Sequence, residues 1–253
     1  MIIDKVYKMN ISILCVYNND EIMNDFSSNL GNQKINGEYQ LILINNKGNV
    51  YHSIREAYNS YLDKIKYDIV VFIHQDVRFM NESALQNLID EIEKIYDFGI
   101  IGVAGCKSGK QWKLLSSITH GLDHKNAGET VQEAIEVQTV DECCFVMHSN
   151  DIQKTGFSEI DGWHMYAVEQ CLRMTAEGRK NYVIPAENIW HMSNGRSLDP
   201  SYIITLEQVL SKYCNDILYL NTTVKQWKAH GLFPYLYRKY YYVKQVFKKI
   251  LFY

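Results

Sequence analysis

Residues 67–79 read YDIVVFIHQDVRF, and our interpretation of the chain starts from them. Five apolar residues at positions 69–73 are followed at once by His74, Gln75 and Asp76. An unbroken β-branched and aromatic run predicts a strand buried on both faces, as in a parallel sheet. Ligands of open α/β sheets bind just beyond the carboxyl ends of the strands. Asp76 could therefore hold a divalent cation there, or it could cap a helix that begins near residue 81; this stretch alone does not decide.

Other apolar runs and amphipathic segments surround this strand in a regular order. Each apolar run ends at polar or turn-forming residues, and each amphipathic segment carries apolar residues at helical spacing. The alternation predicts an α/β fold with a mostly parallel central sheet flanked by helices and joined by right-handed crossovers. The predicted strands are residues 10–17, 40–44, 69–73 and 99–104, and the predicted helices are a segment ending near residue 30, residues 49–66 and residues 82–96.

The composition limits the classes of protein to consider. With 47% hydrophobic and 22% charged residues, the 253-residue chain can bury a core and shows no low-complexity stretch. Its net charge of −3 argues against a nucleic-acid partner. The six cysteines form no C-x-x-C pair, which predicts small buried side chains in a reducing compartment. Because the sequence shows neither a signal peptide nor an apolar run of about 18 residues, we expect a cytoplasmic protein.

The sequence lacks the usual glycine-rich loops that bind phosphate. No G-x-G-x-x-G or Walker sequence is present, and Gly99, Gly102 and Gly105 lie in a strand-like run that opens into a polar loop. We interpret these glycines as positions of close backbone packing. A metal is then the expected counter-charge for phosphate, which favours a metal-binding role for Asp76. Residues 107–136 show no clear pattern and predict a long lid or binding loop.

Two later segments carry polar residues where a site would need them. Residues 137–146 predict a strand that contains Asp141 and Glu142, and acids in an apolar segment are costly unless they are paired or face a polar cleft. Strand alternation sends them to opposite faces, so at most one should point into the site. Residues 162–178 predict a helix, and residues 181–185 predict a short strand.

Taken in order, these features resemble glycosyltransferase family 2, which has the GT-A fold. The resemblance is strongest to the branch for polysaccharide and antibiotic biosynthesis, whose third strand ends in an H-Q-D variant of the D-x-D motif. It covers roughly residues 9–197. The segments that carry it are Val16-Tyr17-Asn18, Ile73-His74-Gln75-Asp76, Val140-Asp141, Gly162-Trp163-His164-Met165-Tyr166 running into Cys171-Leu172-Arg173, and His191-x-Ser193-x-Gly195.

The resemblance implies a binding site for a nucleoside diphosphate sugar. Tyr17, Asn18 and a neighbouring acid would border the nucleobase, and Asn45 stands where many members have an Asp that binds the base. His74 could instead simply pack its ring at the strand end. The implied donor-binding residues are Tyr17, Asn18, Glu21 (or its neighbour Asp20), Asn45, His74, Gln75 and Asp76.

The resemblance also implies a metal site. Asp76 would be the metal-binding acid and His191 would complete the site, although His191 could also be an ordinary structural histidine. One or two carboxylates plus substrate phosphates are the usual ligands of Mg²⁺ in such sites. A histidine ligand favours Mn²⁺. We therefore expect Mn²⁺ or Mg²⁺ as the cofactor.

One departure from the family pattern concerns the catalytic base. Many members carry an Asp where this chain has Ala167. Either Glu169 takes that role, or Asp141 or Glu142 does, or the protein is inactive. A base must reach the acceptor hydroxyl within about 3 Å, directly or through a water, and the sequence does not place any of these acids that closely.

The resemblance implies a reaction as well as a site. A helix beginning at Trp163 would line the acceptor side through Trp163, His164 and Tyr166. We expect a metal-dependent, inverting glycosyltransferase that moves a sugar from a nucleoside diphosphate sugar, with a UDP-sugar as the expected donor. The acceptor would be a hydroxyl of a glycan or a lipid-linked molecule in surface polysaccharide or glycoconjugate synthesis.

Two rival functions are compatible with parts of the sequence. A nucleotidyltransferase would carry a glycine-rich, basic loop after the first strand, and residues 18–21 (NNDE) are neither. A non-catalytic sugar-nucleotide or glycan-binding module is favoured by Ala167. Turnover of a panel of sugar nucleotides would separate an enzyme from such a module.

The chain after residue 200 differs in character from the rest. We divide the chain into a GT-A domain, residues 1–200, and a helical, basic-aromatic extension, residues 201–253. Residues 202–220 predict one helix, and residues 235–252 predict another in which aromatic and aliphatic residues alternate with Lys and Arg. Such a helix suits a membrane surface, here the inner face of the cell membrane, but it could equally pack on the domain or on the second subunit of a homodimer.

Overall fold

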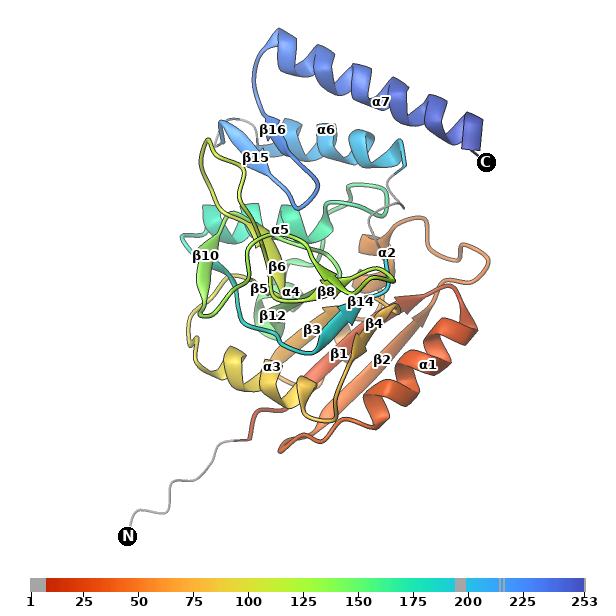
Figure 1. Ribbon diagram of the computed structural model, residues 1–253, viewed down its shortest axis with the longest axis vertical. Coiled ribbons are helices and arrows are strands. Elements are labelled where there is room, and N and C mark those ends of the chain that lie inside the picture. The colour runs from red at the N-terminus through yellow and green to blue at the C-terminus, as the bar shows by residue number, and fades with distance from the viewer. Residues whose placement is uncertain (1–7, 194–198, 214, 216, 253) are drawn as a thin grey trace.

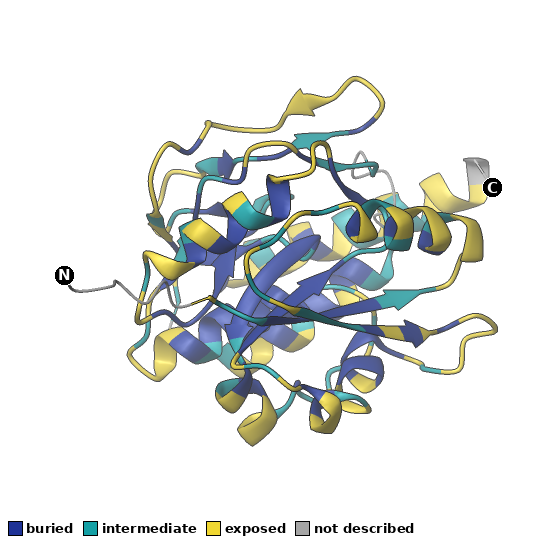
Figure 2. Ribbon diagram, turned by 90° about the horizontal axis from the view of Figure 1, so that it is seen from below, coloured by how far each residue is buried: buried dark blue, intermediate teal, exposed yellow. Residues whose placement is uncertain are grey.

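A seven-stranded sheet forms the centre of the computed structural model, which describes residues 8–193, 199–213, 215 and 217–252 (Figure 1). Its strands lie in the order β10-β13-β5-β12-β3-β1-β2. Figure 2 shows these buried strands in dark blue between helices whose outer surfaces are exposed. The predicted α/β fold is confirmed. The strands are β1 (Ile11–Tyr17), β2 (Tyr39–Asn45), β3 (Ile69–Ile73), β5 (Ile101–Gly102), β10 (Ile135–Val137), β12 (Cys144–His148) and β13 (Asn181–Val183).

Strand β3 is buried on both faces, as its apolar sequence predicts. Ile69, Val71 and Ile73 belong to a core shared with α1 and α3. Val70 and Phe72 belong to a second core, shared with α2, α4 and α5. Because successive side chains of a strand point to opposite faces, a strand between two helical layers is apolar at every position. The helices of these layers are α1 (Asp20–Gly31), α2 (Ile54–Asn59), the 3₁₀ turn η1 (Leu62–Lys64), α3 (Ala84–Glu93), α4 (Ser149–Thr155) and α5 (Tyr166–Ala176).

The direction of the strands differs from the prediction, because the central sheet is mixed and not mostly parallel. β1 pairs in parallel with β2 and β3, and β13 pairs in parallel with β5. β12 is antiparallel to both β3 and β5, and β10 is antiparallel to β13. Parallel neighbours need a long crossover, usually a helix, whereas antiparallel neighbours do not. Residues 107–143, all described, contain strands and no helix, so β12 can return in the opposite direction.

Residues 107–136, predicted to be a long lid or binding loop, are built in part from short strands. They carry short strands that pair with distant segments: β7 pairs with β6, which also pairs with β11, and β8 pairs with β14. Strands of two or three residues are too short to show alternating apolar and polar residues in the sequence. They can be recognised only from the strands with which they pair. These strands are β4 (Val77–Phe79), β6 (Ala104–Cys106), β7 (Leu114–Ser116), β8 (Thr119–His120), β9 (Lys125–Asn126), β11 (Thr139–Val140) and β14 (Ile189–His191).

The three glycines around β5 and β6 are positions of close packing, as predicted. A Cβ atom at Gly99 would lie 2.6 Å from Cβ of Met174, and one at Gly102 would lie 2.5 Å from Cβ of Val140. A Cβ at Gly105 would meet backbone at a similar distance. The predicted strand over residues 99–104 is divided between β5 and β6, which belong to different sheets.

Helix α2 is much shorter than the helix predicted over residues 49–66. The Ser53 side chain accepts a hydrogen bond from Glu56 N (3.1 Å), which caps the helix at this point. Asn49 has a positive φ of 56°, outside the helical region. The apolar spacing was a correct guide to the buried face, but local capping sets where the helix begins.

The chain after residue 200 contains a hairpin between two helices, so it is not purely helical as predicted. The helix predicted over residues 202–220 ends early because the chain turns into β15 and pairs with β16. Leu206 and Trp227 share a buried core with Val168 of α5, which joins this part to the rest of the fold. The division at residue 200 stays a prediction. The elements are α6 (Ser201–Tyr213), β15 (Tyr219–Asn221), β16 (Gln226–Lys228) and α7 (Leu232–Phe252).

Candidate active site

The turn after β3 brings His74, Gln75 and Asp76 to the carboxyl end of the sheet. Strand β4 follows at once and pairs with β14, which carries His191. Met192 N donates a hydrogen bond to Asp76 O (3.0 Å), which extends this pairing to the turn. The β4–β14 pairing therefore places His191 beside Asp76, although the two residues lie far apart in the sequence.

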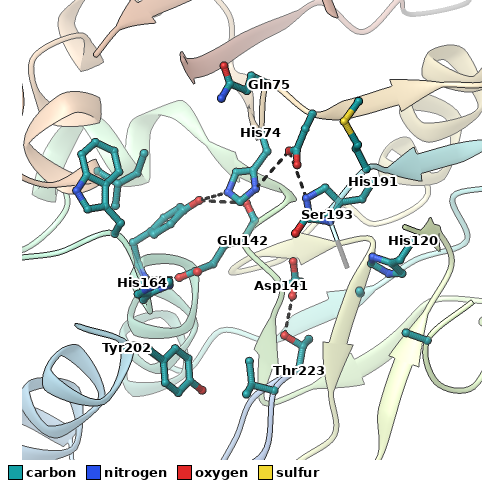
Figure 3. A pocket seen from close by; sticks show the side chains of 18 of the residues that line it. His74, Gln75, His120, Asp141, Glu142, His164, His191, Ser193, Tyr202 and Thr223 are labelled. Carbon is teal, nitrogen blue, oxygen red and sulfur yellow. Dashed lines mark hydrogen bonds and ion pairs between the residues drawn. The ribbon is translucent and has the colours of Figure 1, made fainter. Parts of the chain in front are cut away.

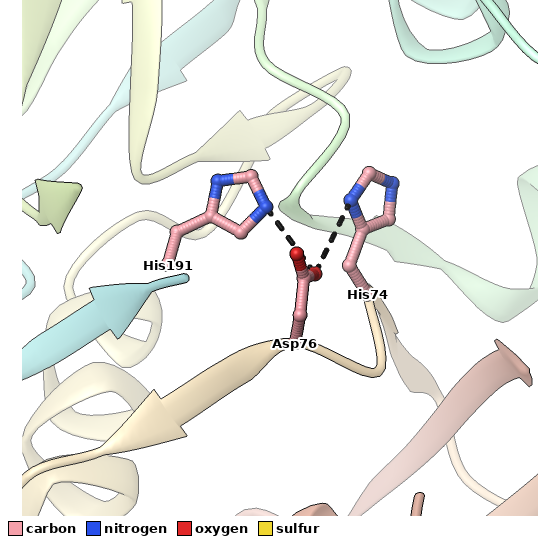
Figure 4. A group of neighbouring side chains, drawn as sticks. All are labelled: His74, Asp76 and His191. Atoms are coloured by element: carbon pink, nitrogen blue, oxygen red, sulfur yellow. Dashed lines mark ion pairs between the residues drawn. The ribbon is translucent and has the colours of Figure 1, made fainter. Parts of the chain in front are cut away.

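Three side chains converge at this point, as Figure 4 shows. Nε2 of His191 lies 3.3 Å from Oδ1 of Asp76, and Nδ1 of His74 lies 4.0 Å from the same oxygen. One nitrogen or oxygen of each residue lies within 4.8 Å of the others. A single cation between them would contact all three, so we refer to His74, Asp76 and His191 as the metal cluster.

The metal cluster fits a divalent cation by two observations. Nε2 of His191 is buried and makes no regular hydrogen bond, although it faces Oδ1 of Asp76 at 3.3 Å. Nε2 of His74 is hydrogen-bonded to the Tyr166 hydroxyl (2.7 Å), which leaves Nδ1 facing Asp76. An orphaned buried polar atom is costly, and a cation would give it a partner. Two imidazoles and one carboxylate suit Mn²⁺ better than Mg²⁺, which prefers oxygen ligands.

The charges of the cluster agree with this role. Burial alone would raise the pKa of Asp76, but the two histidines lower it to about 2, so the carboxylate is ionised. Burial and the neighbouring His191 lower the pKa of His74, which favours the neutral ring that binds metals. Burial also lowers the pKa of His191, but Asp76 outweighs it and raises that pKa above its usual value. A bound cation would take the place of the proton that this ion pair holds.

The metal cluster opens into a pocket of about 1220 Å³. Figure 3 shows Asp141 and Glu142 between the cluster and Thr223, with His164 and Tyr202 along another wall. The walls come from the ends of β1 and β3, the break between β11 and β12, the segment before α5, and the β15–β16 hairpin. A pocket of this size can enclose a drug-sized ligand or larger.

The predicted donor-binding residues divide into two groups. Tyr17, Asn18 and Gln75 line the pocket together with the metal cluster. Gln75 Oε1 accepts a hydrogen bond from Asn18 N (3.3 Å), and its amide donates to Asn18 Oδ1 (2.8 Å). Glu21 and Asn45 do not belong to the pocket lining within the described residues, and both are exposed.

Asn46, and not the predicted Asn45, faces the pocket. Asn46 lines the pocket and is only 5% exposed, and its N donates to Tyr17 O (2.8 Å). Oδ1 of Asn45 instead accepts from Lys47 N (2.8 Å) in the turn after β2. The strand alternation decides this difference of one position, since neighbouring residues point in opposite directions.

Asp141 and Glu142 both line the pocket, contrary to our expectation that at most one would. The predicted strand over residues 137–146 is broken between Val140 and Cys144, so strand alternation does not apply to these two acids. The break is bent, and Asp141 Oδ1 accepts from Cys143 N (3.0 Å) inside it.

The two acids differ in protonation. Burial would raise the pKa of Asp141, but the hydrogen bond from the Thr223 hydroxyl (2.6 Å) and the nearby His191 lower it below its usual value. Burial and the charge of Asp141 raise the pKa of Glu142 to about 8. Near neutral pH the pair therefore consists of an ionised Asp141 and a largely protonated Glu142.

The predicted acceptor-side residues also reach the pocket. Trp163, His164 and Tyr166 all line it. Helix α5 begins at Tyr166 and not at Trp163, because Met165 has a left-handed conformation (φ 63°) that ends any helix before it. Nε2 of His164 lies 3.7 Å from Oδ1 of Asp199, another pocket residue.

Glu169 lies away from the pocket. Its carboxylate accepts from Arg55 Nε (3.1 Å), Lys212 Nζ (2.8 Å) and Ser158 Oγ (2.7 Å). The side chains of Arg55 and Glu169 are only 1% and 3% exposed. These contacts tie α5 to α2 and α6, which makes Glu169 part of a buried ion-pair network.

Several pocket residues were missed by the sequence reasoning, among them His120, Asp199 and Thr223. The ring centroid of His120 lies 5.7 Å from that of His191, because β8 pairs with β14. Thr223 reaches Asp141 from 82 positions away. None of the three stands in a motif, so no signal in the sequence could have found them; Gly195, the last residue of the predicted H-x-S-x-G motif, lies outside the described residues.

The sheet, the side chains that follow β3 and the pocket beyond them define a glycosyltransferase of the GT-A class. Residues 12–213 match the glycosyltransferase-like family, and the chain belongs to this family. Among the curated proteins, none matches the sequence. The resemblance to family 2 glycosyltransferases is thus confirmed at the level of family and fold.

Solved structures with the same fold share little sequence with this chain. The mannosyltransferase PcManGT from Pyrobaculum calidifontis, solved with GDP-Man and Mn²⁺, is 11% identical with a TM-score of 0.57 over 94% of this chain and 70% of that one. GalNAc-T7, solved with UDP, GalNAc and Mn²⁺, is 8% identical with a TM-score of 0.54 over 81% of this chain and 48% of that one. TarS of S. aureus is 10% identical with a TM-score of 0.53 over 83% of this chain and 40% of that one. The chain spans less than half the length of the last two, and at these identities the likeness shows the fold alone.

Proposed function

We propose that the protein is a metal-dependent, inverting glycosyltransferase that moves a sugar from a nucleoside diphosphate sugar to an acceptor hydroxyl. The observation that carries this proposal is the metal cluster inside a large polar pocket of a chain that belongs to a glycosyltransferase-like family. Two structural neighbours were solved with Mn²⁺, one with GDP-Man and the other with UDP and GalNAc. A sugar nucleotide, with a UDP-sugar as the expected donor, and a divalent cation suit this pocket.

The metal cluster would hold Mn²⁺, or Mg²⁺ with lower preference, against the diphosphate of the donor. The cation, when bound, neutralises the charge that develops on the departing diphosphate. Asp76 supplies the ionised carboxylate, and His191 and His74 supply imidazole nitrogens. The Tyr166 hydroxyl holds the His74 ring in the orientation that points Nδ1 toward Asp76.

The nucleoside would lie beyond the carboxyl ends of β1 and β3. Tyr17 and Asn18 border this part of the pocket, and Asn46 replaces Asn45 in our assignment because only Asn46 lines it. Gln75 is hydrogen-bonded to Asn18 and so connects the nucleoside side to the metal cluster. We no longer assign Glu21 a role, since it is exposed on α1 away from the pocket.

Asp141 is the residue we assign as the catalytic base. A base that removes the acceptor proton must be ionised, and Asp141 is the ionised acid of the pair beside the cluster. Thr223 holds its second oxygen and fixes its direction. Glu142, largely protonated, would donate a hydrogen bond to a substrate hydroxyl. We withdraw Glu169, because Arg55 and Lys212 occupy its carboxylate outside the pocket.

The acceptor would enter past Trp163 and His164. Trp163 is 37% exposed at the edge of the pocket, and an aromatic face there can stack on a sugar ring. We propose a glycan or lipid-linked acceptor in the synthesis of a surface polysaccharide or glycoconjugate. A cytoplasmic enzyme at the inner face of the cell membrane would meet such an acceptor.

The test is a turnover assay on the purified chain with Mn²⁺ and a panel of sugar nucleotides. Thermal shift first selects the donor, because a ligand that binds the native state raises its apparent stability. We expect metal-dependent release of the nucleoside diphosphate and transfer to a glycan or lipid-linked acceptor, and chelation should stop both. A selected donor that is turned over equally well after chelation would overturn the metal assignment.

One observation favours a second function, a sugar-nucleotide or glycan-binding module without catalysis. Ala167 occupies the position of the usual base, and Glu169 is held in buried ion pairs. If the selected donor binds tightly but is not consumed with any acceptor mixture, the module is the better description.

A further inference from the structure

Helix α7 presents two different faces, and Figure 1 shows it at the outer end of the molecule, alongside α6. Its inner face is fixed to the domain. Arg238 is 5% exposed and donates to Glu207 (2.8 Å) and to Lys228 O (2.7 Å). Tyr241 and Tyr242 pack against the core formed with α6. The helix therefore packs on its own domain, which was one of the alternatives left open by the sequence.

The outer face of α7 is a continuous apolar stripe. From Phe233 onward its residues follow one another three or four positions apart, and Leu232 stands four positions before Leu236, which at 3.6 residues per turn aligns them on one side of the helix. Each side chain is between 47% and 84% exposed, which is unusual for so many large apolar residues together. We define the apolar stripe as Leu232, Phe233, Leu236, Tyr240, Val243, Phe247 and Ile250.

Positive charge borders the stripe on both sides. At 100° per residue, Lys239 lies along one edge of it, and Lys244 and Lys248 lie along the other. All three are exposed. Residues 217–253 contain no Asp or Glu, so nothing in this part of the chain offsets the charge.

We infer that α7 is a docking surface for an anionic lipid bilayer, with the apolar stripe inserted at the interface and the lysines on the lipid headgroups. Exposed aromatic and aliphatic residues flanked by lysines are the pattern of helices that lie in the plane of a membrane. No helix in the described ranges is long and apolar enough to cross a bilayer. A second copy of the chain fits the same surface less well, because an antiparallel pair of α7 helices would bring the lysine rows of both copies together.

The docking helix is attached to two walls of the pocket. Lys225 Nζ donates to the Tyr237 hydroxyl of α7 (2.5 Å). Lys225 comes two residues after Thr223, in the hairpin segment that lines the pocket. At the other end of α7, Lys249 Nζ lies 3.6 Å from Asp199. If the proposed transferase function holds, a bilayer under α7 lies close to the acceptor side, which suits an acceptor carried on a lipid.

The test is co-sedimentation of the full chain with vesicles of phosphatidylcholine alone or mixed with phosphatidylglycerol. We expect binding to the mixed vesicles that weakens as salt is raised, and much weaker binding to the neutral ones. Leu236→Glu with Phe247→Glu should abolish binding. Lys239→Gln with Lys244→Gln and Lys248→Gln should weaken it roughly a hundredfold, since each lysine near an anionic surface contributes roughly fivefold. Tyr96→Glu, at a 97% exposed position outside α7, is the matched control and should bind as the unaltered chain does.

Two results would overturn the inference. One is a stripe variant that sediments with mixed vesicles as well as the unaltered chain. The other is an unaltered chain that ignores vesicles and is a dimer by light scattering, while the stripe variant is monomeric; the stripe would then be a subunit interface. Unfolding curves for each variant check that the fold is intact. Asp76→Asn should still bind vesicles, so failure of the transferase proposal and failure of the membrane proposal are separate outcomes.

Discussion

Two acids of this protein were both candidate site residues in the sequence, but they differ in what surrounds the carboxylate. Asp76 lies at the end of β3 with two histidines, and Glu169 lies in the first turn of α5 with Arg55 and Lys212. Histidine can give up its proton and bind a cation instead, whereas arginine keeps its charge at any ordinary pH and lysine does so when exposed. Asp76 is therefore open to a metal, while Glu169 is already neutralised by the protein itself.

The difference also explains which region faces the pocket. A carboxylate that is held in permanent ion pairs is not available to bind a substrate. When these ion pairs are buried, they link helices instead. A carboxylate that faces only two imidazole rings, at 3.3 and 4.0 Å, retains the capacity to bind a cation. Partner chemistry, and not burial alone, separates a functional acid from a structural one here. The following variants can break or sharpen this contrast.

The largest effect should come from Asp76→Asn. Loss of the ionised ligand should lower metal-dependent transfer about a thousandfold, comparable to removing one strong electrostatic contact to the transition state. The melting temperature in the absence of metal should fall by only a few degrees, because the fold loses the ion pair with His191 but no apolar packing. Steady-state rates with and without Mn²⁺ measure this, with the exposed Asp63→Asn as control. Full activity in Asp76→Asn would contradict the metal assignment.

Glu169→Gln should act on stability and not on chemistry. Removing the charge leaves Arg55 buried without its ionic partner, which should cost about 3 kcal/mol of unfolding free energy. Rates measured well below the melting temperature should stay near those of the unaltered enzyme. Urea unfolding and initial rates give the two numbers, and Glu177→Gln at the exposed end of the same helix is the control. A variant that keeps its stability but loses turnover would restore Glu169 as the base.

Tyr166→Phe should weaken the metal site without touching a ligand. The hydroxyl orients His74, and loss of such a supporting contact usually lowers metal affinity about tenfold or more. Electron paramagnetic resonance of free Mn²⁺ during a titration would measure this. Tyr202→Phe removes another buried hydroxyl of the pocket, one that contacts Thr222 and Trp227, and should leave the affinity unchanged.

A different kind of effect, on the pH dependence of stability, should come from Glu142→Gln. The carboxyl has a pKa of about 8 in the folded protein against an ordinary value of 4.5. Between these pH values the native state holds more protons than the unfolded state, so stability from this group falls as pH rises. The variant should flatten that fall by at most about 1.4 kcal/mol per pH unit. Urea unfolding across this range tests it, with the exposed Glu159→Gln as control; an unchanged slope would mean that Glu142 is ionised throughout.

Some parts of the site could be predicted and others could not. The unbroken apolar run of β3 followed by His74, Gln75 and Asp76 was sufficient to expect a polar site at the strand end, and the resemblance added His191. The roles of Asp141 and Glu142 could not be judged, because a break after Val140 replaced the strand whose alternation we had assumed. A bend of this kind depends on the pairing of β11 with β6 and leaves no periodic signal.

Glu169 illustrates the limit most clearly. Its two charged partners stand 114 and 43 positions away, on α2 and α6, and no local pattern joins them. The same holds for Thr223, whose contact with Asp141 joins distant parts of the chain. Thr223 lies in a hairpin that begins where we had predicted the end of a helix over residues 202–220. Long-range pairs of this kind are decided by how the elements pack.

The sequence by itself determined the layered α/β core, the polar residues at the end of β3 and the amphipathic, basic character of α7, because each depends on periodicity and composition within one segment. Only the tertiary structure decided that His74, Asp76 and His191 form one cluster, that Glu169 is withdrawn from the pocket and that the apolar face of α7 remains uncovered. The physical reason is that a polar side chain takes its role from the charge and burial of its neighbours, and these neighbours come from elements far apart in the chain.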